Sequence, residues 1–99
     1  MKNIIEHLNK AFENRIRLGA MSLLAIHDTL DFNTLKETLD VTDGNLASHL
    51  SALEKLNYIT VKKTFIGKKP NTTYSATKEG NKAFKDHLNA LEALIRNKK

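Results

Sequence analysis

The stretch from residue 30 to residue 59 reads LDFNTLKETLDVTDGNLASHLSALEKLNYI, and it predicts the fold of the chain. A short helical run ends at Leu39, residues 40–42 form a tight connection, and Thr42 can cap a second helix that we expect over residues 43–57. The leucines of this second helix recur at steps of four, three and three residues, so they share one face. Two helices joined by so short a turn are typical of the helix–turn–helix motif. The leucines of the stripe are Leu46, Leu50, Leu53 and Leu56.

The face opposite the leucines is small and polar. A helix that enters the major groove of DNA, which is about 12 Å wide, needs slim side chains with donors and acceptors for the base edges. The free N–H groups at the start of such a helix also suit a phosphate, so we expect Thr42 and Gly44 to contact one. The alternative is an ordinary surface helix with polar side chains. We predict that the residues that read the bases are Asn45, Ser48, His49 and Ala52.

The sequence after the second helix changes from a helical to an alternating pattern. Residues 58–65 and 72–76 are expected to be strands, joined by a loop over residues 66–71, so that they form a β-hairpin, the wing. Four lysines cluster on this wing, and like charges so close together are unfavourable unless they are well solvated or face an anion. Between residues 62 and 73 we therefore predict phosphate contacts from Lys62, Lys63, Lys68, Lys69, Asn71 and Thr72.

The segment before the helix–turn–helix is also expected to be helical. Apolar residues at helical spacing predict a helix over residues 3–12, and Asn14 is expected to cap the next one. Residues 28–31 are expected to form a turn, after which Asn33 would cap the short helix that ends at Leu39.

The first and last helices carry apolar stripes that little else in the chain would cover. The last helix is expected over residues 78–97, capped by Thr77. We predict that it and the helix over residues 3–12 pair across a two-fold axis in a homodimer. This would place two reading helices about 34 Å apart, one turn of DNA. The predicted dimer contacts are Ile4, Ile5, Leu8, Phe12, Phe84, Leu88, Leu91 and Ile95.

Composition and charge fit a DNA-binding domain. With 99 residues, 40% of them hydrophobic, the chain is expected to be a single domain over residues 1–99. Residues 1–57 carry 6 basic and 8 acidic side chains, whereas residues 58–99 carry 10 basic and 3 acidic ones, so the net charge of +5 is concentrated in the second part. The absence of cysteine excludes disulfides and thiolate sites and fits a cytoplasmic protein. No segment resembles a signal peptide or a membrane anchor.

The sequence offers no catalytic or cofactor signature. Its four histidines show no metal-ligand spacing, and it contains no nucleophile elbow, phosphate loop or glycine-rich fingerprint. We therefore expect neither an enzyme nor a bound cofactor or metal. A histidine–carboxylate pair at a dimer interface is the remaining metal alternative, with His87 and Asp86 or His7 and Glu6, although solvated surface residues explain these pairs more simply.

Several blocks of the chain, in the same order, resemble the small stand-alone winged helix–turn–helix transcriptional regulators related to the MarR and ArsR families. The similarity extends from Asn14 to Phe84 without a large gap. The blocks are Leu30–Glu37, Val41–Leu50, Leu53–Ile59, the wing segment Phe65–Tyr74 and Thr77–Gly80.

The resemblance implies a fold that is mainly α with a small β-hairpin, and a dimer on double-stranded DNA. By position, Asn45, Ser48 and His49 match the stretch that reads bases in that family, and the wing matches the part that lies on the DNA backbone or in the minor groove. Two positions depart from the family pattern. Asn57 replaces a glycine, which asparagine tolerates because it enters the left-handed region readily, and Ser48 stands where many relatives have Arg or Lys.

One alternative function stays open, because winged helices also serve as protein–protein docking modules without DNA binding. The predicted reading helix carries Asp43 and Glu54 against only Lys55, so it is not basic. The DNA sequence, the regulated genes, the direction of regulation and any small-molecule effector are not specified by the sequence.

Overall fold

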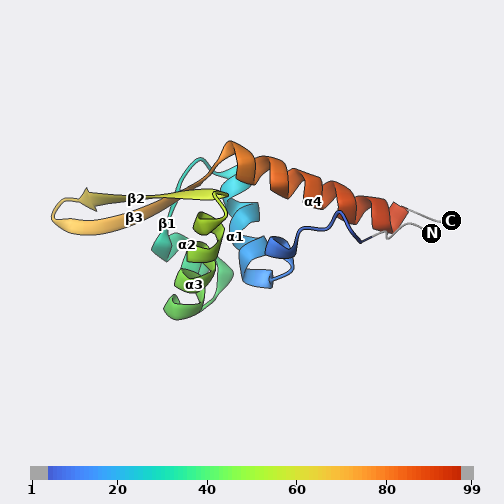
Figure 1. The fold of residues 1–99 in the computed structure, drawn as a ribbon. Coiled ribbons are helices and arrows are strands. Elements are labelled where there is room, and N and C mark those ends of the chain that lie inside the picture. The colour runs from blue at the N-terminus through green and yellow to red at the C-terminus, as the bar shows by residue number, and fades with distance from the viewer. Residues whose placement is uncertain (1–4, 97–99) are drawn as a thin grey trace.

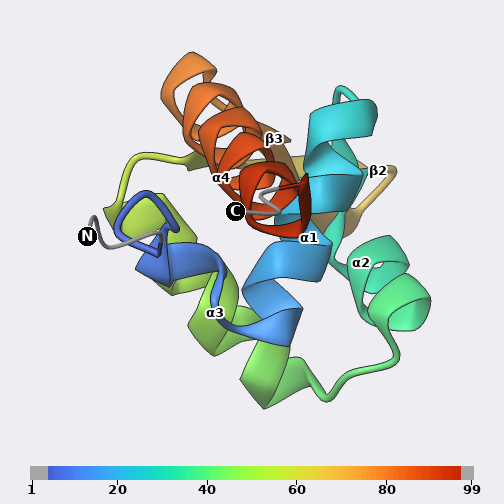
Figure 2. The same ribbon diagram turned by 90° about the vertical axis from the view of Figure 1, so that its right-hand side faces the viewer.

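The computed structural model describes residues 5–96 and shows a helical core from which two elements project in opposite directions (Figure 1). The wing extends to one side and the C-terminal helix to the other. In Figure 2, α4 points toward the viewer and the wing lies behind the core. The elements are η1 (Lys10–Phe12), α1 (Arg15–Ile26), β1 (Leu30–Asp31), α2 (Phe32–Leu39), α3 (Asp43–Lys55), β2 (Ile59–Ile66), β3 (Lys69–Ala76) and α4 (Lys78–Arg96). The predicted fold class, a winged helix–turn–helix, is confirmed.

The helix–turn–helix consists of α2 and α3, which pack on α1. Three of the four leucines of the predicted stripe, Leu46, Leu50 and Leu53, are buried in the core. Leu56 is not, because α3 ends at Lys55, two residues before the predicted end, and Leu56 caps the helix with a large part of its side chain exposed. Thr42 caps the start of α3 as predicted, since its Oγ1 accepts a hydrogen bond from the N–H of Asn45 at 3.2 Å.

The sheet has three antiparallel strands in the order β1-β3-β2. The turn expected over residues 28–31 is wrong in its second half, because Leu30 and Asp31 form β1 and pair with Tyr74 and Thr73 of β3. The cap expected at Asn33 is also wrong. Asp31 caps α2 instead, with its Oδ1 accepting a hydrogen bond from the N–H of Thr34 at 2.8 Å, and this bond lowers the pKa of Asp31.

The wing is longer than the sequence predicts. The expected loop over residues 66–71 shrinks to a two-residue turn, because Ile66 pairs with Lys69. Gly67 has a φ of +63° in the first position of this turn, as in a type II′ hairpin. Pro70, which argued for a loop, lies in β3 opposite Phe65, at a point where β3 has a neighbouring strand on one side only.

The helix expected over residues 3–12 is wrong for the described residues 5–9, which form turns and a bend, and only η1 follows. The side chain of Asn9 caps η1 by accepting a hydrogen bond from the N–H of Ala11. Such a local side-chain bond competes with a continuous helix. Ile4, one of the predicted dimer contacts, lies outside the described residues.

Two further residues predicted at the dimer interface are buried in the core of the single chain. The ring of Phe12, only 2% exposed, stacks on Tyr58 with centroids 5.6 Å apart and meets Phe84 edge to face at 5.4 Å. The prediction is therefore corrected for Phe12 and Phe84, because both side chains are buried in the core of one chain and cannot contact a second copy.

Candidate nucleic-acid interface

The outward face of α3 is formed by slim residues. Of the residues predicted to read bases, Asn45 and Ser48 are exposed and Ala52 is half-buried. Ser51, one turn after Ser48, is also exposed on this face, although the sequence analysis did not select it. The spacing of the leucines places Ser51 opposite them and would have identified it. The arrangement exposes hydroxyl and amide groups that can meet base edges, and Lys55 follows them at the C-terminal end of the same face.

His49 lies at the flank of this face. Its side chain is half-buried, and its Nδ1 accepts a hydrogen bond from Nη1 of Arg17 at 3.2 Å. Arg17 is itself fixed by a 2.7 Å hydrogen bond from its Nε to the carbonyl of Ala11. The pair therefore joins α3 to α1, and His49 presents its other ring nitrogen from a position held by tertiary structure.

The start of α3 borders a hollow of about 420 Å³ whose lining includes one basic and one acidic side chain, Arg15 and Asp40. Arg15, at the start of α1, is exposed and lines this hollow together with Thr42 and Asn45. Gly44 is also exposed, and no atom lies within 4 Å of the position that a Cβ would occupy there. Lys36 pairs with Asp43 at 2.8 Å, which offsets the carboxylate in the first turn of α3. A phosphate can approach this end of the helix closely.

The four lysines of the wing are all exposed. The pairing of β2 with β3 places Lys62 opposite Thr73, Lys63 opposite Thr72 and Thr64 opposite Asn71. Residues 59–76 contain no aspartate or glutamate, so no carboxylate of the hairpin itself neutralises these charges. Asn71 and Thr72, predicted as neutral donors to phosphate, are half-buried. The wing thus presents an uncompensated positive surface.

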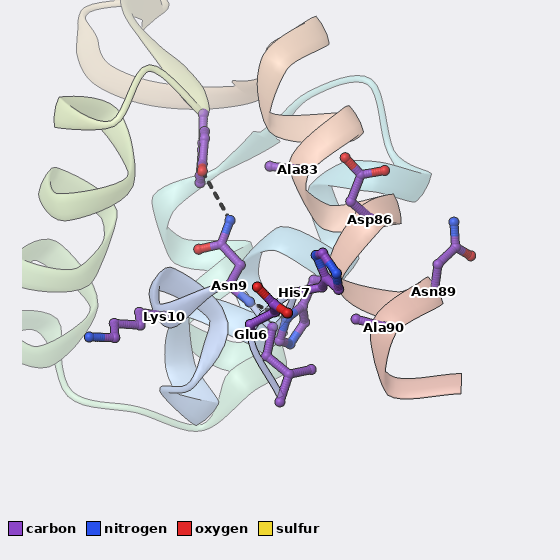
Figure 3. A pocket seen from close by; sticks show the side chains of 11 residues that line it. Glu6, His7, Asn9, Lys10, Ala83, Asp86, Asn89 and Ala90 are labelled. Carbon is purple, nitrogen blue, oxygen red and sulfur yellow. Dashed lines mark hydrogen bonds between the residues drawn. The ribbon is translucent and has the colours of Figure 1, made fainter. Parts of the chain in front are cut away.

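A larger hollow, about 840 Å³, lies between the N-terminal segment and α4 (Figure 3). Asn9 crosses it: its backbone N–H donates to Nδ1 of His87 at 2.9 Å and its Nδ2 donates to the hydroxyl of Tyr58 at 3.0 Å. Burial lowers the pKa of His87, and the nearby Glu13 carboxylate opposes this effect in part. His87 is thereby engaged as a hydrogen-bond acceptor. Within residues 5–96, no group of three or more potential metal-ligating side chains occurs.

The family model described as "Winged helix DNA-binding domain" matches residues 16–95. The chain belongs to this winged helix family. The match includes α3 and the whole wing, so both candidate DNA-contacting elements lie within the residues that the family model matches. The chain is accordingly similar to small winged helix regulators, as the sequence analysis predicted.

Two relatives cover nearly the whole winged helix. An uncharacterised protein of Methanocaldococcus jannaschii, MJ0432, is 35% identical over 88 residues, which are 89% of this chain and 96% of the relative. A transcriptional regulator homologue from Pyrococcus horikoshii OT3 has a similar structure, with a TM-score of 0.83, 32% identity and coverage of 93% of this chain and 89% of the other. The chain therefore carries a winged helix DNA-binding domain, and its fold is similar to that of a transcriptional regulator homologue.

A more distant structure shares the fold. A MarR-family transcriptional regulator from Silicibacter pomeroyi is 13% identical, with a TM-score of 0.63 and coverage of 97% of this chain and 66% of the other.

Among residues 5–96, no helix has the length and apolar character to cross a membrane.

Proposed function

We propose that the protein is a transcriptional regulator that binds specific sequences of double-stranded DNA in the cytoplasm as a homodimer. In each subunit α3 reads the major groove and the wing holds phosphates. The observation that carries this proposal is the division of charge between the two elements. The outward face of α3 is slim and nearly neutral, whereas the wing carries four exposed lysines and no carboxylate.

The division of charge suggests a division of roles. Phosphate contacts add affinity for any sequence, whereas base contacts distinguish sequences. Asn45 is the residue best suited to read a base, because its amide can pair bidentately with adenine and its side chain is exposed. Lys68 and Lys69 are best suited to hold phosphates, because they lie in and next to the turn of the wing.

Support for the homodimer comes from α4. Beyond Phe84 and His87, which face the core, its stripe continues with Leu88, Leu91 and Ile95, and all three are exposed. A second copy of the same helix would cover these side chains and would supply a second reading helix, which raises the affinity for a two-part site.

The experiment is a selection of bound duplexes from a random library, followed by affinity measurements on the selected duplex and on a scrambled one. Asn45→Ala should reduce discrimination between the two by about 1–3 kcal/mol. The double variant Lys68→Gln/Lys69→Gln should instead weaken binding to both duplexes alike and reduce the slope of log affinity against log salt by about 4, because the homodimer loses four lysine contacts.

A matched control tests whether position or total charge matters. Lys82→Gln/Lys85→Gln removes the same two charges from α4, and it should leave the salt slope of the wild type unchanged. The role assignment is wrong if the wing variant and the Asn45 variant act identically on both duplexes. Absence of DNA binding, with partner binding that hardly responds to salt, would favour a protein-docking module.

A further inference from the structure

The tip of the wing carries large apolar side chains that the fold does not use. Phe65 is 72% exposed and Ile66 is 65% exposed, and neither packs on the hydrophobic core among the described residues. The strand register places Phe65 opposite Pro70 on one face of the hairpin, and Ile66 opposite Lys69 on the other. The tip is therefore apolar on both faces, immediately next to the turn at residues 67–68.

The charge around this tip identifies the chemistry of its partner. Lys63 lies two residues before Phe65 on β2, Lys68 lies in the turn and Lys69 pairs with Ile66, and the whole hairpin lacks a carboxylate. An apolar tip flanked by lysines complements a ligand that is negative at its edges and apolar between them. Duplex DNA has this character, because its phosphates line the groove edges and its stacked bases lie between them.

The strand register places each apolar side chain of the tip beside a lysine on the same face of the hairpin. Phe65 follows Lys63 two residues later on β2, roughly 7 Å further along the strand, and Ile66 pairs with Lys69. A hairpin that lies along the minor groove can therefore hold phosphates at the groove edge with these lysines and direct an apolar side chain between the edges. Val61 is partly buried against the core, and the five residues from it to Ile66 carry the tip about 17 Å outward, clear of the helices.

We propose that Phe65 and Ile66 form an apolar wedge that enters the minor groove, partly unstacks a base step and bends the duplex. This rests on the proposed DNA-binding function and deepens it. Side chains of this type bend DNA by about 20–90° when they insert between base steps. The cost of bending depends on the step, because pyrimidine–purine steps kink easily and A-tracts are stiff. The wedge therefore adds sequence preference at positions that α3 does not touch.

The test measures the bend directly. The probe is the duplex recovered by selection, labelled with a donor and an acceptor dye at its two ends, and energy transfer is recorded at saturating protein. Wild type should raise the transfer, and Phe65→Ser/Ile66→Ser should abolish the rise. Replacing a flexible step under the wing by an A-tract should weaken wild-type binding by about tenfold and leave the variant unaffected.

A matched control keeps the comparison specific. Ile26, at the end of α1, is 77% exposed, so Ile26→Ser removes an equally exposed apolar side chain elsewhere, and it should bend DNA like wild type. Because all three side chains are exposed, the variants should unfold at the same urea concentration as wild type within error.

The outcomes separate the wedge from the function on which it rests. Equal bending by wild type and by the Phe65/Ile66 variant, both bound at saturation, overturns the wedge and leaves DNA binding intact. Absence of wild-type binding to any duplex overturns the proposed function itself. Binding to anionic lipid vesicles that depends on Phe65 and Ile66, together with an unchanged DNA bend, also overturns the wedge and assigns the tip to a membrane surface.

Discussion

At the scale of single residues, Gly80 allows the first turn of α4 to lie directly against the backbone of Tyr58. A Cβ at this position would lie 2.0 Å from the carbonyl oxygen of Tyr58, far inside any permitted contact with backbone. Gly44, in the first turn of α3, would meet no atom within 4 Å. Gly44 and Gly80 therefore differ in the space around them, and the same substitution should have opposite effects on stability.

We expect Gly80→Ala to lower the free energy of unfolding by about 1–3 kcal/mol or more, because the backbone of Tyr58 must move and this outweighs the gain in helix propensity. Gly44→Ala should raise it by up to about 1 kcal/mol, since alanine favours the helix and has room. Urea unfolding of both variants measures the difference. Equal changes of the same sign would show that the close approach at Tyr58 is not needed.

At the scale of elements, Asn9 connects the N-terminal segment to α4 through His87. The bond requires a neutral ring, because Nδ1 of a protonated His87 has no lone pair to accept the N–H of Asn9. Burial holds the pKa of His87 below its usual value of about 6.5. The unfolded chain therefore takes up the proton first as the pH falls.

The resulting pH dependence has a definite sign. The stabilisation from neutral His87 is fully present above about pH 6.5, and it is lost progressively as the pH falls from there through the lowered pKa. The free energy of unfolding should thus decrease between pH 7 and pH 5 more in wild type than in His87→Gln. His27→Gln, at an exposed position, is the control and should behave like wild type. Parallel pH profiles for wild type and His87→Gln would contradict this account.

The sequence predicted those elements whose signals are local. The cap at Asn14, which accepts hydrogen bonds from Ile16 and Arg17, is confirmed, and so is the left-handed conformation of Asn57 with a φ of +63°. In contrast, β1 exists only because β3 returns beside it, more than 40 residues later. Pro70 was misleading for the same reason, since its tolerance in a strand depends on which neighbours that strand has.

In the candidate site, too, the features with local sequence signals were predicted and those that depend on distant residues were not. The polar face of α3 and the lysines of the wing could be predicted from spacing and charge. The hydrogen bond between His49 and Arg17 could not, because it joins residues 32 positions apart. The length of the wing was also missed, and with it the exposed apolar tip at Phe65 and Ile66, which local sequence placed at the border of a loop.

At the scale of the whole molecule, the exposed stripe of α4 is the surface through which we propose that two copies pair. Ile95 is 79% exposed, and Leu91 lies one turn earlier on the same stripe. Ile5, of the N-terminal segment, is exposed as well, and Leu8 is half-buried. Apolar side chains at alternating steps of three and four residues are typical of helix–helix seams.

We expect Leu91→Glu/Ile95→Glu to raise the dissociation constant of the homodimer by at least about a hundredfold, because two carboxylates would be buried in each half of the seam. Sedimentation velocity at micromolar concentration measures the change. The control Ile26→Glu adds a charge at an equally exposed apolar position of α1 and should remain dimeric. A monomeric wild type at this concentration would refute the dimer.

The junction between α3 and α4 has a consequence for how such a dimer measures distance along DNA. Asn57 and Tyr58, which follow the C-cap of α3, hold the start of α4 through three hydrogen bonds. These run from Thr77 Oγ1 to the carbonyl of Asn57, from the N–H of Thr77 to the carbonyl of Tyr58, and from Asn57 Nδ2 to Glu79. Gly80 presses against the same segment. In the proposed dimer joined through α4, these contacts fix the position of each α3 relative to the α4 seam, and so fix the distance between the two reading helices. The spacing of the two half-sites is therefore recognised as well. If an operator is lengthened by half a helical turn, one of the two α3 helices meets the wrong side of the duplex.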